Sequence, residues 1–260
     1  MKISHAELYY KKGIKLNGIP LLKYREIEII PNVTSTAEGS VKVKIGNNEV
    51  LAGVKMEVGE PFPDTPNEGN LMVDVQLTPI ASENYEFGPP SIEAIELARV
   101  TDRAIRESKC IDQESLVIKS GEKVWTIIID LVPINVDGGL FDLFSIAAIS
   151  ALLTAKFPEL EDDKPDYKHL SENKLKVEKI PVTTTVYKYK NYLFIDPSND
   201  DLKIAEARLS ITTVDDENIV AFQKGGEGSF TKEEIRKAVE IAFEKGKEIR
   251  EVIKQVFNLK

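Results

Sequence analysis

The chain has 260 residues, of which 42% are hydrophobic and 30% charged, and its formal net charge is −9. This composition is typical of a globular protein with one large domain or two small ones, and the acidic balance restricts any RNA contact to a local basic patch. Cys110 is the single cysteine and His5 and His169 are the only histidines, which excludes an internal disulfide and argues against a Ser-His-Asp triad or a thiolate metal cluster.

The first half of the chain alternates β-type runs with helical ones. Residues 24–30, 41–45, 50–58 and 71–77 are rich in β-branched residues and bounded by Gly, Pro or Asn, which predicts a meander of four strands. A helix is expected from about Ser91, after Pro89-Pro90, to about Ser108. A further strand at 124–136 and a helix from about Asp142 to Phe157 complete this half.

The helix predicted at 91–108 holds three of the seven arginines, Arg99, Arg103 and Arg106. Their spacing places them within about 60° of one another around the helix axis. This is the clearest cationic stripe in the chain, and a planar guanidinium suits phosphate. The alternative is a solvated face, because acidic residues lie three or four positions away and can pair with the arginines.

Two glycines, Gly138 and Gly139, precede the helix predicted at 142–157. A helix N-terminus reached through glycines attracts phosphate, yet here Asp142 stands where the anion would sit. A unit charge about 4 Å away costs roughly 4 kcal/mol per ligand charge at an effective dielectric of about 20, whereas one helix terminus contributes about 0.3–2 kcal/mol. We therefore expect no phosphate at this loop, and we expect Asp142 to cap its own helix.

The second half repeats the pattern. The polar segment 158–181 lacks apolar periodicity and should be a surface connection. Strands are expected at 182–189, 192–195, 207–214 and 219–223, and Thr231 with Glu234 forms a capping box for a final helix. Two α+β halves, each with helices on one face of its sheet, are favoured. The expected division is an N-terminal arm at 1–23, a first domain at 24–157, the connection, and a second domain at 182–257.

Three aspartates, Asp196, Asp200 and Asp201, cluster after the strand predicted at 192–195. Carboxylates at this density can act as a general acid or as Mg²⁺ ligands. Turn chemistry explains the same residues without any function, because Asp, Asn, Ser and Pro are preferred in turns. We favour the turn.

Several runs in the chain match a known family. They are 50–55 (VLAGVK), 61–70 (PFPDTPNEGN), 88–90 (GPP) and 94–103 (AIELARVTDR). Together they closely resemble the RNase PH-like ring subunits of the RNA exosome, in particular the archaeal subunit that lacks its own active site. The resemblance covers about residues 14 to 250. It implies an α+β, RNase PH-like fold of the ribosomal protein S5 domain 2-like type, with two βα halves whose helices pack on mixed or antiparallel sheets.

The family's reaction, as the resemblance implies, is 3′→5′ phosphorolysis of single-stranded RNA, and this chain departs from the catalytic pattern. Catalytic members follow the small loop residues with Ser or Thr and then Arg, where this chain has Leu140-Phe141-Asp142. Their Ile-Arg-x-Asp-Gly-Arg motif reads IKLNGI at 14–19, and Tyr24-Arg25 remain from its end. Asp196 matches the first catalytic acid, while Leu202 falls at the second. We expect a non-catalytic subunit.

The resemblance also implies partners. In the family's non-catalytic subunits, arginines of this helix face the RNA path beside the neighbour's active site. Arg99 and Arg103 of this chain match them by position. Arg106 is a third candidate, with an exposed pair to Asp102 as its alternative. The expected partners are a catalytic RNase PH-like subunit, in heterodimers that form a trimer of dimers, RNA-binding cap subunits, and single-stranded RNA. We expect no catalytic residue, metal or cofactor.

A cytoplasmic location is expected, because no apolar run approaches the roughly 20 residues that span a bilayer and the first residues lack a signal-peptide core. Two other functions remain open. One is a self-sufficient RNase PH-type phosphorolytic exoribonuclease that binds phosphate despite Asp142. The other is a purely structural ring scaffold whose arginines never touch RNA.

Overall fold

The computed structural model describes residues 3–161 and 164–259. Its first sheet has the order β1-β2-β3-β6-β4, with β5 paired to β6. The strands are β1 (Ile27–Pro31), β2 (Gly39–Ile45), β3 (Asn48–Gly59), β4 (Asn70–Val75), β5 (Val117–Lys119) and β6 (Lys123–Asn135), and the short 3₁₀ helix η1 (Glu114–Leu116) precedes β5.

The predicted four-stranded meander is wrong at its last strand. Strands β1 to β3 are antiparallel neighbours, but β4 pairs with β6 and runs parallel to it, from Asn70 opposite Thr126 to Val75 opposite Leu131. Residues 60–69 between β3 and β4 form a connection too long for a tight hairpin, so β4 is free to leave its sequence neighbour. The 13-residue β6 then fills the place beside β3.

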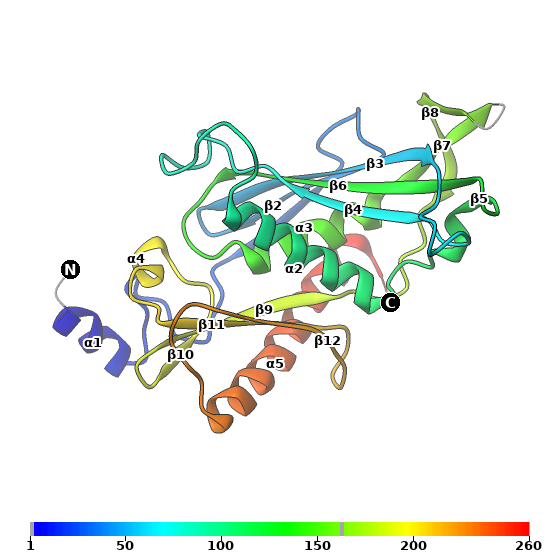
Figure 1. Cartoon of the computed structure of the whole chain (residues 1–260). Helices are drawn as coiled ribbons and strands as arrows, with labels where there is room; N and C mark the ends of the chain where they lie inside the picture. Colours follow the sequence, from blue (N-terminus) through cyan, green and yellow to red (C-terminus); the bar gives the residue numbers. More distant parts are fainter. Residues whose placement is uncertain (1–2, 162–163, 260) are drawn as a thin grey trace.

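The second sheet has the order β10-β9-β11-β12 and is antiparallel throughout. Its strands are β9 (Val182–Tyr189), β10 (Tyr192–Phe194), β11 (Ala207–Thr213) and β12 (Ile219–Gly225). Helices α2 (Ile92–Ser108) and α3 (Phe141–Thr154) lie between the two sheets, and α5 (Lys232–Phe257) covers the far face of the second one (Figure 1). The expectation of helices on one face of each sheet is therefore wrong for the second sheet, which is covered on both faces.

Alternation along β9 explains this double cover. Val186 packs in an apolar cluster with Ala238 and Ala242 of α5. On the opposite side, the Thr183 N–H donates to the Ser145 hydroxyl of α3 at 2.9 Å, and the Thr183 and Thr212 hydroxyls are 2.8 Å apart. Because neighbouring side chains point to opposite faces of a strand, one strand serves an apolar layer and a polar layer.

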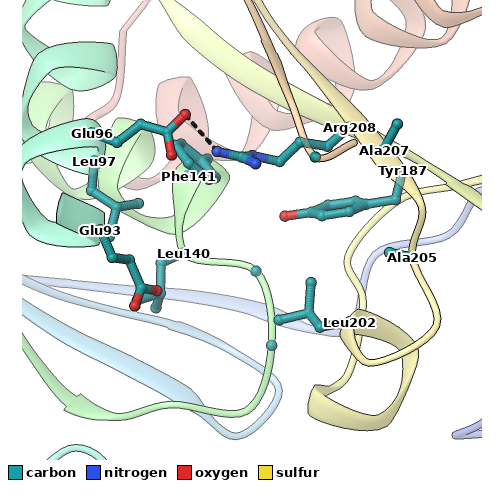
Figure 2. A pocket seen from close by; sticks show the side chains of 13 residues that line it. Glu93, Glu96, Leu97, Leu140, Phe141, Tyr187, Leu202, Ala205, Ala207 and Arg208 are labelled. Carbon is teal, nitrogen blue, oxygen red and sulfur yellow. Dashed lines mark ion pairs between the residues drawn. The ribbon is translucent and has the colours of Figure 1, made fainter. Parts of the chain in front are cut away.

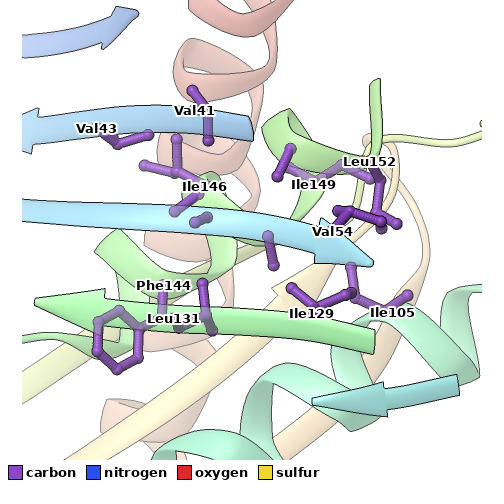
Figure 3. Packing of buried hydrophobic residues seen from close by; sticks show 14 of the residues in the cluster. Val41, Val43, Val54, Ile105, Ile129, Leu131, Phe144, Ile146, Ile149 and Leu152 are labelled. Carbon is purple, nitrogen blue, oxygen red and sulfur yellow. The ribbon is translucent and has the colours of Figure 1, made fainter. Parts of the chain in front are cut away.

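The largest apolar core joins the first sheet to α3 (Figure 3). Residues of α3 are buried from Asp142 to Leu152, so the helix has no solvated face. Gly39 of β2 permits the close approach of this helix, because a Cβ there would lie 2.6 Å from the Ala151 carbonyl oxygen.

The polar segment expected to be a surface connection is exposed, but it forms a hairpin. Strands β7 (Lys156–Glu161) and β8 (Lys164–Lys174) pair antiparallel with most of their side chains in solvent. A hairpin with neither face buried leaves no apolar period in the sequence. The hairpin begins at Lys156, so α3 ends earlier than predicted, at Thr154.

Near the other end of the chain, α1 (Ile3–Lys11) packs through Ala6 and Tyr10 against Tyr187, Tyr189 and Phe194 of the second sheet. In the described part of the chain, no helix has the length and apolar character needed to cross a membrane.

Candidate functional site

The glycine loop between β6 and α3 meets the loop that follows β10. Gly138 has a φ of +120°, and a Cβ at this position would lie 1.7 Å from the Pro197 carbonyl oxygen. Only glycine meets both conditions, the backbone angle and the close approach. The contact brings the loop expected to hold phosphate in catalytic relatives next to Asp196, the residue that matches a catalytic acid.

Asp142 does not cap α3, contrary to the prediction. The N-cap is Leu140, which makes no side-chain capping hydrogen bond, and Asp142 lies inside the first turn. Its side chain turns inward, where Oδ2 accepts a hydrogen bond from the Tyr24 hydroxyl at 2.5 Å and Oδ1 has no hydrogen-bond partner among the described residues.

The environment of Asp142 changes its acidity. Burial raises the pKa of the Asp142 carboxyl to about 6, and the hydrogen bond from Tyr24 lowers it in part. Burial likewise raises the pKa of Tyr24 well above its usual range, so this hydroxyl stays protonated and donates. Asp142, which stands where an anion would otherwise bind, thus links α3 to the segment before β1 through its hydrogen bond with Tyr24.

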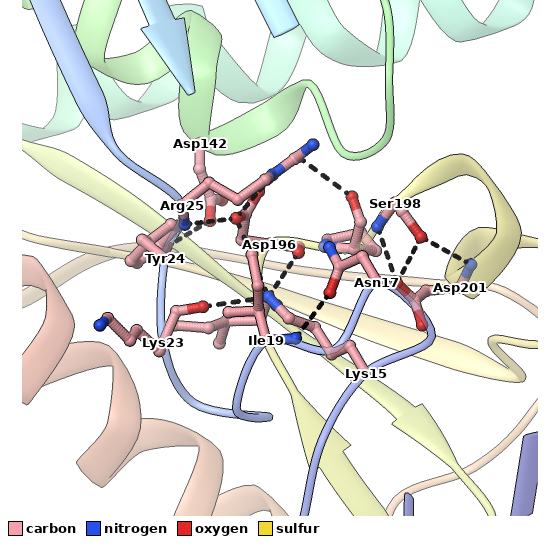
Figure 4. Close-up of polar contacts among 12 residues, drawn as sticks. Lys15, Asn17, Ile19, Lys23, Tyr24, Arg25, Asp142, Asp196, Ser198 and Asp201 are labelled. Carbon is pink, nitrogen blue, oxygen red and sulfur yellow. Dashed lines mark hydrogen bonds and ion pairs between the residues drawn. The ribbon is translucent and has the colours of Figure 1, made fainter. Parts of the chain in front are cut away.

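Asp196 is held by two cations (Figure 4). The Arg25 guanidinium binds its carboxylate in bidentate fashion, with Nε–Oδ2 at 2.9 Å and Nη2–Oδ1 at 2.7 Å, and the Arg25 backbone N–H donates to Oδ2 at 2.8 Å. Arg25 also pairs with Asp137 at 3.0 Å. Both oxygens of the Asp196 carboxylate are therefore bound within the chain, and its side chain is only 2% exposed.

Lys15 is the second cation. Its ammonium group is fully buried, lies 3.8 Å from Asp196 Oδ2, and donates to the carbonyl oxygens of Lys23, Ile195 and Asp196. Burial lowers the pKa of Lys15 to about 8. Three backbone acceptors and one carboxylate give the charge the partners that a buried ammonium requires.

The other two aspartates of the cluster do not join Asp196. Asp201 is buried, accepts from the Tyr10 hydroxyl and the Leu16 N–H, and completes a capping box with Ser198 for the short helix α4 (Asn199–Leu202). Asp200 is exposed and pairs with Lys203. These contacts match the turn interpretation. In residues 3–161 and 164–259, no group of three or more His, Cys, Asp or Glu side chains is placed to hold a metal ion.

A pocket of about 300 Å³ opens beside the glycine loop (Figure 2). Its wall contains Gly138, Gly139, Leu140 and Phe141. Residues of α2, α4, β9, β11 and the neighbouring loops close it: Glu93, Glu96, Leu97, Tyr187, Leu202, Ala205, Ala207, Arg208 and Gly226. The only ion pair drawn across it joins Arg208 to Glu96, at 2.6 Å.

The three arginines of α2 differ in their contacts. Arg99 is exposed and has no hydrogen-bond or ion-pair partner in the part of the chain that the structure describes. Arg103 makes one hydrogen bond to the neutral amide of Gln223 at 2.7 Å. Arg106 binds the Asp102 carboxylate through two nitrogens and the Leu71 carbonyl at 2.9 Å, as its alternative interpretation stated.

Sequence reasoning did not find Lys15, Tyr24 and Arg208 as parts of the site. A signal existed for Lys15, which stands where catalytic members have the first arginine of their N-terminal motif and so keeps a cation there. Tyr24 was identified only as a remnant of that motif, without its contact to Asp142. No local pattern marked Arg208.

Comparisons with known proteins identify the family of the chain. The model of the 3′ exoribonuclease family, domain 1, matches residues 23–158, and that of domain 2 matches residues 179–245. The exosome complex component Rrp42 of Thermoplasma acidophilum is 44% identical over 241 residues, which cover 93% of this chain and 90% of that protein. Its counterpart from Pyrococcus furiosus is 46% identical over 233 residues, covering 88% and 84%.

Solved structures give the same result. A chain of the Archaeoglobus fulgidus exosome with RNA bound to the active site superposes with a TM-score of 0.90 at 38% identity, covering 96% of this chain and 97% of the other. A chain of an archaeal exosome core gives 0.85 at 36% identity, with 96% and 95% covered. Matched by both domain models and by full-length relatives, the chain belongs to the 3′ exoribonuclease family and has the RNase PH-like fold.

Proposed function

We propose that this chain is a ring subunit of an RNA exosome that performs no phosphorolysis itself and presents Arg99 and Arg103 to RNA at the active site of a catalytic partner. The partner would be an RNase PH-like subunit in a heterodimer, three of which close the ring, with RNA-binding cap subunits above it. The relatives named as exosome components and the match to an exosome with bound RNA support this assignment.

The observation that carries the non-catalytic role is the internal neutralisation of Asp196. Arg25, from the remnant of the catalytic motif, takes both carboxylate oxygens of Asp196. Neither group remains free for phosphate or for a proton transfer, because a catalytic group must reach the reacting atoms. The glycine loop adds a second obstacle, since it is followed by Leu140, Phe141 and the buried Asp142 instead of anion-binding side chains.

The face around Arg99 supports an RNA contact beside a partner. Ile92 and Ile95 precede Arg99 on α2 and are 88% and 48% exposed, and Phe87 of the adjoining loop is 86% exposed. Apolar side chains gathered on a surface indicate contact with another protein. Arg99 follows this apolar face and is exposed, and no carboxylate of the described residues pairs with it, so its guanidinium is available to a phosphate.

The salt dependence of RNA binding by the reconstituted ring tests the role of the arginines. We expect the double variant Arg99→Gln/Arg103→Gln to bind single-stranded RNA more weakly. Its slope of log affinity against log salt should fall by about 0.7 per lost phosphate contact. Arg236→Gln is the matched control, because Arg236 is an exposed arginine of α5 on the far side of the second sheet. A double variant with the slope and affinity of the wild-type ring would contradict the proposal and support the structural scaffold.

A further inference from the structure

The pocket beside the glycine loop has walls suited to a flat ligand. At about 300 Å³ it lies at the lower end of small-molecule sites, which run from about 300 to 1,000 Å³. The guanidinium carbon of Arg208 lies 4.4 Å from the centroid of the Phe141 ring, and both groups line the pocket. Aromatic rings and guanidinium planes are the surfaces on which heterocycles stack.

Tyr187 supplies a polar group that the fold leaves unused. The residue is 4% exposed, yet its hydroxyl has no hydrogen-bond partner among residues 3–161 and 164–259, and it points into the pocket (Figure 2). A Cβ on Gly139 would lie 2.7 Å from this hydroxyl oxygen, so the glycine keeps it accessible. A hydroxyl that opens into the pocket can bond a ligand that offers a donor or an acceptor, and such a hydrogen bond contributes about 0.5–1.5 kcal/mol net.

The charges of the pocket disfavour an anion. Arg208 is the one cation of the lining and is paired with Glu96, while Glu93 is a second carboxylate without an ion pair in the described chain. The net charge of the lining residues is therefore negative. A phosphate group would meet a lining of net negative charge here, whereas a neutral ring with an exocyclic amine would meet carboxylate acceptors.

We propose that this pocket binds a nucleobase, stacked on the Phe141–Arg208 pair and hydrogen-bonded to Tyr187, and that it excludes phosphate. The base can belong to a free nucleoside or to a strand of RNA. The proposal goes beyond the role of the arginines of α2 and needs no ring assembly, so it is tested on the isolated full-length chain.

Calorimetric titration with three probes tests the charge preference. Adenosine should bind, adenosine monophosphate should bind at least tenfold more weakly, and inorganic phosphate should give no binding heat. A short oligoadenylate that displaces adenosine would identify a base of RNA as the natural source, and one that does not would leave the free nucleoside. Absence of adenosine binding to the folded wild-type chain at millimolar concentration, or phosphate binding as tight as that of adenosine, would overturn the proposal.

Two substitutions test the location. Tyr187→Phe keeps the ring and removes the hydroxyl, so adenosine affinity should fall about fivefold, as for one neutral hydrogen bond of about 1 kcal/mol. Tyr192→Phe is the matched control, because Tyr192 is a half-buried tyrosine of the same sheet that does not line the pocket. Ala205→Phe, at a half-buried position of the wall, should abolish binding by filling the space. Equal affinities for all three variants and the wild type would place adenosine elsewhere and refute the site. RNA affinity of the ring and adenosine affinity of the chain are separate measurements, so either proposal can fail alone.

Discussion

The Asp142 carboxylate is held inside the protein by the Tyr24 hydroxyl and lies in the first turn of α3. The start of a helix favours a negative charge, but burial of the whole side chain opposes it, and burial is the larger effect because the pKa rises to about 6. The burial of the Asp142 carboxylate lowers the stability of the fold by an amount that depends on pH. In the unfolded chain the carboxyl has its ordinary pKa near 3.8, so the folded state binds the proton more tightly.

The substitution Asp142→Asn should therefore stabilise the protein at neutral pH. The stability of the wild type falls as pH rises from about 3.8 to about 6 and gains no further penalty above that window. Asparagine keeps the acceptor for Tyr24 and carries no charge. The difference in the free energy of unfolding between the variant and the wild type should grow by roughly 2 kcal/mol, in favour of the variant, as pH rises from about 4 to about 8.

Urea unfolding at several pH values checks this prediction. The matched control is Asp200→Asn, because Asp200 is an exposed carboxylate of the same acidic type whose pKa is lowered by Lys203. A pH-independent difference between Asp142→Asn and the wild type would show that the Asp142 carboxylate is not buried as described.

At the scale of elements, the segment from Ile14 to Arg25 is fastened to the loop after β10. Lys15 and Arg25 contribute two cations and Asp196 contributes the anion between them, all with side chains less than a tenth exposed. Leu16 donates its N–H to Asp201 in the same loop. Asp196, which matches a catalytic acid of related chains, thus joins the N-terminal segment to the second sheet.

Asp196→Asn should destabilise the protein by about 3–5 kcal/mol, because it leaves the buried charges of Arg25 and Lys15 without their common partner. Asp200→Asn, a few residues away, should change the free energy of unfolding by less than about 0.5 kcal/mol, since its ion pair with Lys203 is exposed. Urea unfolding of the two variants beside the wild type makes the comparison. Equal and small effects would mean that the Asp196 cluster contributes little to folding.

The elements differ in how well their sequences predict them. Helices α2 and α5 begin where expected, because Ser91 and Thr231 form their N-caps with residues three positions away. The parallel pairing of β4 with β6 was missed, since it depends on a partner more than 50 residues further along the chain. The β7–β8 hairpin was missed because its side chains are exposed on both faces.

The site shows the same contrast between features that local sequence predicts and contacts between distant segments that it does not. The glycine loop and Asp196 were recognised from motifs, but their contact through Gly138 and Pro197 is tertiary. The sequence predicts a capping role for Asp142 because aspartate is preferred at helix N-caps. The tertiary contact with Tyr24, which holds the side chain inside the protein, cannot be read from the sequence around it. Arg208 belongs to no motif, and its role depends on Glu96 and Phe141 from two other elements.

For the whole molecule, the net charge of −9 requires that RNA be recognised locally. The face of α2 at Arg99 and Arg103 meets this condition, whereas the region of Asp137, Asp142 and Asp196 does not. The two regions differ in the charge that they present: Arg99 is an unpaired cation at the surface among the described residues, whereas Asp137, Asp142 and Asp196 are carboxylates held by internal contacts. This division of charge is what the proposed role requires, in which the chain contacts a phosphate backbone and does not hold the phosphate that attacks it.

The isolated chain, supplied with single-stranded RNA, inorganic phosphate and Mg²⁺, should therefore release no nucleoside diphosphates. A phosphate at the glycine loop would meet an ionised Asp142 near neutral pH, and repulsion of roughly 4 kcal/mol per ligand charge at about 4 Å corresponds to about three decades of affinity. Co-expressed with a catalytic subunit, the complex should degrade RNA. Asp142→Asn in this chain should leave its Michaelis constant for phosphate unchanged, whereas substitution of the partner's phosphate-binding loop should abolish activity. Phosphate-dependent release by the partner-free chain would instead establish it as an exoribonuclease in its own right, because no other subunit could then supply the phosphate site.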